Sequence, residues 1–329
     1  NMTEFAFSGV GINPHFGTPG NAVDATRIPG GSSAGAGVAV ARGFSDISIG
    51  SDTGGSVRIP AALNGITGFK PTQQRVPRDG AFPLSFTLDA VGPLARSVLE
   101  CAQADAVMAG QPWQPLPRRQ LRGLRVGVPR GLLFTQTEDA VAQAFEQVLQ
   151  ALAQAGARVD DVALDDWLGA PARLQQNGSI TAAEAAHIHA EVLANQPDAI
   201  DSAVLARLRP GQSIMAAHYV GLLRARQRLM AELDAQIADY DVLLLPTVPM
   251  QAPRIDALDH DADAYHRTNV LLLRNTTVFN FYDLPALSLP ITQPAGVLPV
   301  GLMVVGQRSA DRALLAIGHS LQTQLGPLR

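Results

Sequence analysis

Two short loops of glycine and serine constrain the fold of this chain more than any other part of its sequence. The first spans residues 30–33 (GGSS) and the second spans 52–56 (DTGGS), with an apolar helix-like segment and a short strand at Ile47 to Ile49 between them. Consecutive small residues let backbone N–H groups converge, because glycine adopts dihedral angles that other residues avoid. Converging N–H groups beside a hydroxyl suit acyl transfer, in which a nucleophile acts next to donors for the developing oxyanion.

Other interpretations of the two loops fit the sequence less well. A phosphate-binding loop needs Gly-Lys-Ser/Thr after its glycines, and a dinucleotide fingerprint needs a fuller glycine spacing between a strand and a helix. Residues 31–35 match the Gly-x-Ser-x-Gly elbow of α/β-hydrolases with Ser33 at the centre, but 24–29 (DATRIP) is a poor strand to precede it. Either loop alone is as well explained by a tight turn. Their combination with Asp52, Arg58 and Lys70 favours a chemical role.

The segments GGSSAGAG and SDTGGSVRIPAALNGITGFKPT together resemble the amidase signature family, whose members cleave carboxamides with a Ser, cis-Ser, Lys triad. Weaker similarity extends along the chain to NMTEFA, DVLLLPTVP, DLPALSLPI, LPVGLMVVG and the closing helix near 311–321. The resemblance implies an α/β fold, with one large mixed, mostly parallel sheet flanked by helices, in a single domain over 1–329. It implies a small-molecule amide substrate and no cofactor or metal.

The resemblance also assigns roles by position. Ser56 matches the nucleophile, and Ser32 matches the serine that follows the cis peptide bond and relays its proton. The oxyanion hole is expected from the backbone N–H groups of Thr53, Gly54, Gly55 and Ser56, with Ser33 in the supporting hydrogen-bond network. Asp52 and Arg58 flank the nucleophile loop with opposite charges, and we expect them to brace it as an ion pair or, alternatively, one of them to contact substrate.

The general base is the main departure from the family pattern. The family's triad lysine lies further N-terminal to the cis-Ser than the 31 residues available before Ser32, and the only lysine of this chain is Lys70. Lys70 matches a structural position of the family motif. The alternative is that Lys70 serves as a substitute base. We therefore expect the chain to lack the N-terminal part that carries the base. The alternatives are a non-catalytic amidase-like scaffold and an amidotransferase-like component that passes ammonia to a partner.

Hydrophobic periodicity predicts the remaining elements. A strand at 124–128, a helix at 138–154 ended by Gly156, and a strand at 158–162 form a unit typical of parallel pairing. The near-continuous apolar runs at 241–245, 286–291 and 299–305 indicate strands buried on both faces. Helices are expected at 182–195, 213–239 and 311–325, and the helical region 165–240 is expected to cover the substrate pocket. Arg224, Arg226 and Arg228 are expected on an outer helix face.

Other polar residues give weaker signals. His187 and His189 are two residues apart on a predicted helix and point to different faces, which argues against joint metal binding. His319 is expected to be structural. The acidic residues Asp256, Asp259, Asp261 and Asp263 lack the turn glycine and terminal glutamate of a calcium loop and are expected on a solvated surface. His15 and Phe16 are candidates to line a substrate channel.

Composition excludes several classes of function. A net charge of −4 gives no basic surface for nucleic-acid phosphates. The single cysteine, Cys101, cannot form an internal disulfide, which favours a cytoplasmic location. We find no apolar run long enough to span a membrane and no leader-like segment. Family members often form dimers, so a homodimer is possible by resemblance, although no sequence patch indicates its interface.

Overall fold

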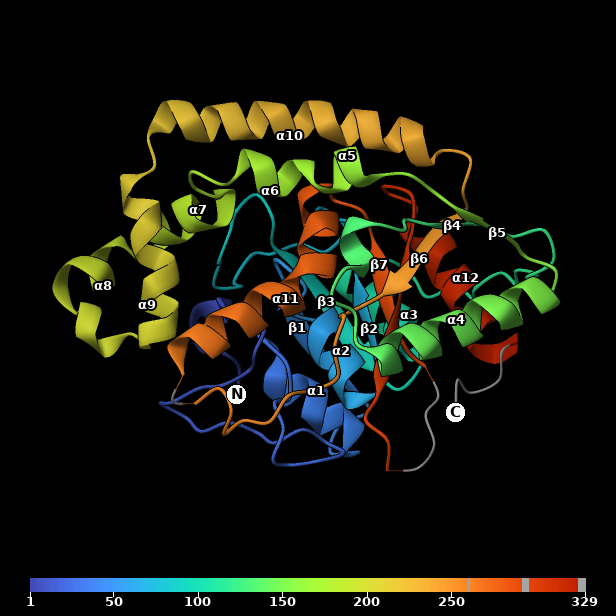
Figure 1. Cartoon of the computed structure of the whole chain (residues 1–329), viewed down its shortest axis with the longest axis horizontal. Helices are drawn as coiled ribbons and strands as arrows, with labels where there is room; N and C mark the ends of the chain where they lie inside the picture. Colours follow the sequence, from blue (N-terminus) through green and yellow to red (C-terminus); the bar gives the residue numbers. More distant parts are fainter. Residues whose placement is uncertain (260, 292–295, 325–329) are drawn as a thin grey trace.

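Eight strands from both halves of the sequence form one sheet in the described part of the chain (Figure 1). The computed structural model describes residues 1–259, 261–291 and 296–324. The strands are β1 (Ile47–Asp52), β2 (Thr67–Lys70), β3 (Ala90–Ala95), β4 (Arg125–Val128), β5 (Arg158–Asp161), β6 (Val242–Pro246), β7 (Ala286–Ile291) and β8 (Val300–Val305). Their order across the sheet is β1-β3-β2-β7-β8-β6-β4-β5.

The direction of the strands corrects one expectation. The sheet is mixed, as predicted, but five of its seven strand pairings are antiparallel and only β4–β5 and β4–β6 are parallel. The apolar runs are buried on both faces as expected. The helices that bury these strands, however, pack over a sheet whose pairings are mostly antiparallel. Burial on both faces therefore does not require the crossover helices that connect parallel strands. Only residues 292–299 separate β7 from β8, which is too short for the crossover that parallel pairing requires.

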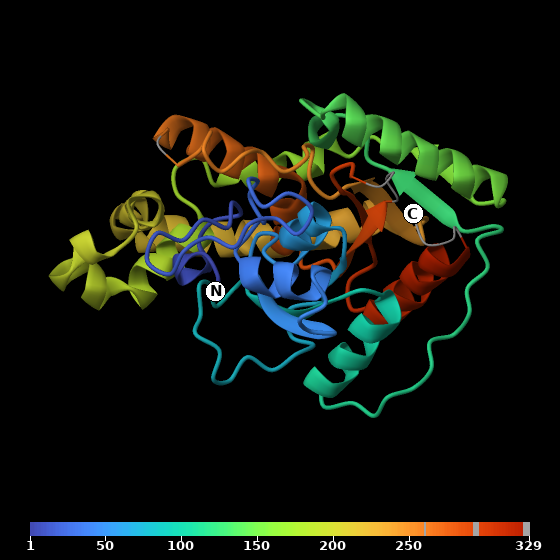
Figure 2. The same cartoon turned by 90° about the horizontal axis from the view of Figure 1, so that it is seen from below.

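Helices cover both faces of this sheet. They are α1 (Ala34–Ala41), α2 (Arg58–Asn64), α3 (Val98–Met108), α4 (Asp139–Gln154), α5 (Asp165–Leu168), α6 (Ala170–Leu174), α7 (Ile180–Ile188), α8 (Ala190–Asn195), α9 (Ser202–Leu208), α10 (Ala216–Ile237), α11 (Ala262–Phe281) and α12 (Asp311–Gln324). One face packs against α3, α4 and α12, of which α3 and α12 lie side by side in Figure 2. The other face packs against α10 and α11.

The central strand β8 shows why helices are needed on both faces of the sheet. In β8, Val300, Leu302 and Val304 belong to the hydrophobic core on one face, while Met303 and Val305 belong to the core on the other. Alternate side chains of a strand point to opposite faces, so a continuously apolar strand needs cover on both. The predicted final helix begins at Asp311 as expected, and its last predicted residue, 325, lies outside the described residues.

The helical region 165–240 contains α5 to α10, and Figure 1 shows α10 running along one edge of the molecule above α5, α6 and α7. One expectation about it is wrong. Arg226 does not lie on the outer face of α10, because its side chain is buried and its Nε donates to the carbonyl of Phe281 at 2.6 Å. The unit β4-α4-β5 is parallel, as predicted. None of the described helices is long and apolar enough to cross a membrane.

Candidate active site

The second serine loop connects β1 to α2 at the edge of the sheet. β1 ends at Asp52, helix α2 begins at Arg58, and Ser56 lies buried in the turn between them. In the described part of the chain, the backbone N–H groups of Thr53, Gly54, Gly55 and Ser56 donate to no other residue, and the Ser56 hydroxyl makes no hydrogen bond. Four adjacent donors without a partner, next to a free hydroxyl, are available to bind a negatively charged oxygen.

A buried ion pair closes this loop at its base. Arg58 donates to both carboxylate oxygens of Asp52, at 2.9 and 3.0 Å, and both side chains are fully buried. The Asp52 carboxylate also accepts from the N–H groups of Val57 and Arg58. Burial alone would raise the pKa of Asp52, but the charge and hydrogen bonds of Arg58, helped by Asn280, hold it below its usual value. The ion pair expected from the sequence is therefore present, and neither partner is open to substrate.

Helix α11 holds the loop from a second side. The hydroxyls of Thr276 and Thr277 both donate to the carbonyl of Gly54, at 2.6 and 3.0 Å. Asn280, one turn further along, donates to Asp52 and accepts from Arg58. Gly55 has a φ of 135°, and a Cβ there would overlap the Thr276 hydroxyl oxygen, so only glycine fits.

These α11 residues were missed by the sequence analysis. The signal was present, because Thr276 and Thr277 precede Asn280 by four and three residues and so share one side of a predicted helix. Such a pattern indicates a buried polar cluster that needs partners elsewhere. The sequence gives no indication that those partners lie more than 200 residues earlier.

The first serine loop lies directly against the second. The N–H of Ser33 donates to the carbonyl of Ser56 at 3.2 Å, and the Ser33 hydroxyl reaches the carbonyl of Ser51 at 3.5 Å. The peptide bond between Gly31 and Ser32 is cis, as the resemblance implies. Ser32 is fully buried, and its hydroxyl has no hydrogen-bond partner among the described residues.

A second buried hydroxyl without a partner lies beside Ser32. Thr3 donates its backbone N–H to the carbonyl of Ser32 at 3.0 Å, and its Oγ1 makes no hydrogen bond to a described residue. A Cβ on Gly31 would come within 2.8 Å of that oxygen, which places Thr3 directly against the cis peptide. Buried hydroxyls are normally paired, so these two mark a place where a polar group fits.

Lys70 occupies the last position of β2, behind the ion pair. Its side chain is buried and its Nζ donates to the carbonyl of Pro71 at 2.8 Å. Burial lowers the pKa of Lys70 to about 8, and the nearby carboxylates of Asp283, Asp52 and Asp311 offset part of that effect. It makes no hydrogen bond to either loop serine.

The remaining candidates lie apart from this site. His187 is exposed and His189 is buried, stacked on Phe5 at 3.8 Å, and the described residues contain no cluster able to hold a metal. His319 lies in α12. Of the acidic residues, Asp256 pairs with Arg254, and Asp261 accepts from the N–H of Ala264 at the start of α11.

His15 and Phe16 do not line either of the two described cavities. His15 lies 3.3 Å from Glu4, and Phe16 is 82% exposed. The channel role expected for them stays a prediction.

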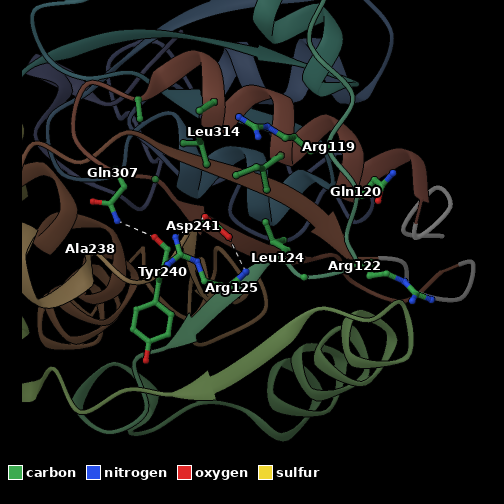
Figure 3. A pocket seen from close by; sticks show the side chains of 15 residues that line it. Arg119, Gln120, Arg122, Leu124, Arg125, Ala238, Tyr240, Asp241, Gln307 and Leu314 are labelled. Atoms are coloured by element: carbon green, nitrogen blue, oxygen red, sulfur yellow. Dashed lines mark hydrogen bonds and ion pairs between the residues drawn. The ribbon is translucent and has the colours of Figure 1, made fainter.

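The first cavity, of about 390 Å³, lies at the start of β4 and along α12 (Figure 3). Arg119, Arg122 and Arg125 line it, and Arg125 is paired there with Asp241. No residue from 30–72 contributes to it. It is therefore separate from the serine loops.

The second cavity is larger, about 610 Å³, and lies next to the N-terminal segment. Its lining includes Ile12, Arg207, Tyr265 and Asn269. Asn269 accepts from the N–H of Gly9 at 2.8 Å, and the carbonyl of Gly9 in turn accepts from the N–H of Gly31 at 2.8 Å. Two hydrogen bonds thus connect the cavity wall to the first serine loop.

Comparison with known proteins shows the family of this chain. The Amidase family model matches residues 1–315. The chain belongs to the amidase family. Solved structures of the family share the fold of this chain. One crystal structure, described as that of an amidase, matches with a TM-score of 0.89 and 36% sequence identity. The match covers 99% of this chain and 74% of the amidase chain.

Three relatives indicate the range of this family. The 2-amino-5-chloromuconic acid deaminase of Comamonas testosteroni is 36% identical over 99% of this chain and 71% of its own length. A glutamyl-tRNA(Gln) amidotransferase subunit of Aromatoleum aromaticum is 33% identical, over 98% and 73%. The indoleacetamide hydrolase of Pseudomonas savastanoi is 32% identical, over 100% and 73%. The chain is thus an amidase-family enzyme, of the class that acts on amide carbon–nitrogen bonds.

Proposed function

We propose that this protein hydrolyses a carboxamide through an acyl-enzyme on Ser56. The observation that carries the proposal is the row of four unpaired backbone N–H groups at Thr53, Gly54, Gly55 and Ser56, beside a serine with a free hydroxyl. Ser56 Oγ attacks the carbonyl carbon, and the carbonyl oxygen takes up negative charge within reach of these donors. When the carbon–nitrogen bond breaks, the amine leaves with a proton, and water then hydrolyses the ester.

Ser32 is the proton relay in this proposal. Its hydroxyl would receive the proton from Ser56 Oγ and return it to the leaving nitrogen, while a neutral amine acts as the base. The two unpaired hydroxyls of Ser32 and Thr3 support this assignment, because they offer partners to such an amine. The family resemblance places that amine on a lysine N-terminal to Ser32. Lys70 is the weaker candidate, because its amine already donates to Pro71.

The second cavity supports a carboxylate-bearing substrate. Arg207 lines it together with Asp201 and Asp259, but it forms no ion pair with either of them or with any other described residue. Its guanidinium stacks on the ring of Phe7, 4.5 Å from the ring centre. Its Nε is buried without a hydrogen-bond partner. Burial lowers the pKa of this guanidinium, and an anion bound there would compensate its charge. An amide that also carries a carboxylate fits such a site, consistent with the acid named for the Comamonas deaminase.

A second candidate is an amidotransferase-like function, favoured by the 33% identity to the Aromatoleum amidotransferase chain. The chemistry at Ser56 would be the same, but the ammonia would pass to a partner chain. Release of free ammonia by the purified protein alone separates the two functions. A cytoplasmic location remains the expectation for either, in keeping with the buried free thiol of Cys101.

The test is ammonia release from a panel of primary amides with and without a carboxylate. We expect turnover by the wild type, fastest on carboxylate-bearing amides, and none by Ser56→Ala. Ser213→Ala is the matched control, because Ser213 is exposed and its hydroxyl donates only to the nearby carbonyl of Pro210. Activity that survives in Ser56→Ala would reject the proposal, as would a wild type that releases no ammonia and carries no reactive serine.

A further inference from the structure

A buried carboxylate on α7 connects the helical region to the segment that precedes β3. Glu184 is only 5% exposed, and both of its oxygens accept hydrogen bonds. The hydroxyls of Ser85 and Thr87 donate to it, as do the N–H of Thr87 at 3.1 Å and the hydroxyl of Tyr219, on α10, at 2.6 Å. One carboxylate therefore joins α7, α10 and the segment 85–87.

The same segment is attached to the nucleophile loop through Asp89. The Thr53 hydroxyl donates to Asp89 Oδ1 at 2.5 Å, and the N–H groups of Leu84 and Ser85 donate to the same carboxylate at 2.9 to 3.0 Å. The sheet register supports this contact, because Asp52 pairs with Ala90 and so brings Thr53 next to Asp89. Ser85 is thus held by Asp89 on one side and by Glu184 on the other.

We propose that Glu184 is a positioning residue for the oxyanion hole. By fixing Ser85 against Asp89, it fixes the Thr53 hydroxyl and with it the backbone N–H groups that begin at Thr53. This inference rests on the proposed role of Ser56. Misplaced donors stabilise a developing oxyanion less, so loss of Glu184 lowers the reactivity of Ser56 although Glu184 makes no hydrogen bond to Ser56.

A purely structural role makes a different prediction. If Glu184 only packs the helical region, its loss lowers the melting temperature and leaves the reactivity of folded protein unchanged. The rate constant for covalent labelling of Ser56 by a fluorophosphonate distinguishes the two roles. The phosphorus-bound oxygen of this reagent accepts hydrogen bonds from the same backbone N–H groups. That rate is measured well below the melting temperature.

The test compares Glu184→Gln with Val148→Ala, which removes methyl groups from the buried face of α4, far from this network. Glutamine keeps the size of the side chain, but its amide nitrogen cannot accept from a hydroxyl. We expect Glu184→Gln to label at least about 10-fold more slowly than wild type. Val148→Ala should lose thermal stability but label at the wild-type rate. Tyr219→Phe, which removes one donor only, should show a smaller slowing and replaces Glu184→Gln if that variant does not fold.

A double variant tests the route through Thr53. Thr53→Val removes the hydroxyl that donates a hydrogen bond to Asp89. This substitution should slow labelling of Ser56 on its own. If Glu184 acts through this hydroxyl, adding Glu184→Gln to Thr53→Val causes little further loss. A wild-type labelling rate in Glu184→Gln, or effects that multiply in the double variant, would overturn the inference. A wild type that does not label at Ser56 would instead reject the proposed function on which it rests.

Discussion

The two sides of the serine loops differ in how their buried polar groups are satisfied. Behind the loops, Asp52 and Arg58 are fully buried and bonded to each other and to Asn280. On the other side, which we call the front, the loops face residues 1–12. Six buried side-chain atoms of the described residues have no hydrogen-bond partner, and four of them lie on this side. They belong to Thr3, Ser32, His189 and Arg207, the last two of which stack on Phe5 and Phe7.

This contrast separates stability from function. A fully paired network stabilises one geometry, and removing a member leaves a buried charge without compensation. An unpaired buried group gives no such stability and costs free energy until a partner arrives. We infer that the rear network holds the nucleophile loop, whereas the front groups are placed for the base and the substrate.

The largest effect is expected at Ser32. Because its buried hydroxyl has no partner in the described structure, Ser32→Ala should not lower the free energy of unfolding, and removal of the unpaired group should raise it by about 1 kcal/mol or more. Activity should nevertheless fall about 10²- to 10⁴-fold, the usual contribution of proton transfer. Urea denaturation and steady-state kinetics measure the two quantities.

Ser288→Ala is the matched control for Ser32→Ala. Ser288 is equally buried, but its hydroxyl is paired with Thr247 at 2.8 Å. Its loss should reduce stability by about 1 kcal/mol and leave kcat unchanged. If Ser32→Ala instead behaved like Ser288→Ala, the contrast between the two sides would fail.

The next effect is expected at the rear ion pair. Arg58→Leu leaves the Asp52 carboxylate buried without its charge partner, which should cost about 3 to 5 kcal/mol of stability. Denaturant titration of the variant checks this value. A loss below about 1 kcal/mol would mean that the pair is not the brace of the loop, since exposed pairs have effects of that size.

A smaller and more selective effect is expected at Arg207. Arg207→Met should lower kcat/KM about 10- to 100-fold for carboxylate-bearing amides, the range for a charged hydrogen bond, and much less for their methyl esters. Stability should be equal or higher, because a buried guanidinium nitrogen without a hydrogen-bond partner is removed. Arg209→Met, an exposed arginine two residues later, is the control. Equal losses on acids and esters would contradict the carboxylate role.

The last effect is expected from Lys70 and is a gradual dependence of stability on pH. Its folded pKa of about 8 lies below the 10.5 of an unfolded lysine, so the unfolded state binds more protons between these values. Wild-type stability should therefore rise with pH across that window relative to Lys70→Met, by at most about 1.4 kcal/mol per pH unit. Parallel stability curves for the two proteins would show that Lys70 does not titrate there.

Local sequence predicted what depends on neighbours in the chain. The two serine loops, the ion pair of Asp52 with Arg58, and the β4-α4-β5 unit all follow from residues within a few turns of one another. The direction of most strands did not follow, because an apolar run reports burial on both faces and not the direction of the neighbouring strand. Thr276 and Asn280 were missed because their partners are set by tertiary folding, not by spacing.

The central claim is that Ser56 is the nucleophile, and the most direct measurement is the site of covalent labelling. Wild-type protein is treated with a fluorophosphonate, digested, and its peptides are identified by mass spectrometry. The account predicts a single adduct on the peptide that contains Ser56, lost in Ser56→Ala and retained in Ser213→Ala. An adduct on another residue, or an unlabelled Ser56 in protein that still turns over amides, would contradict it.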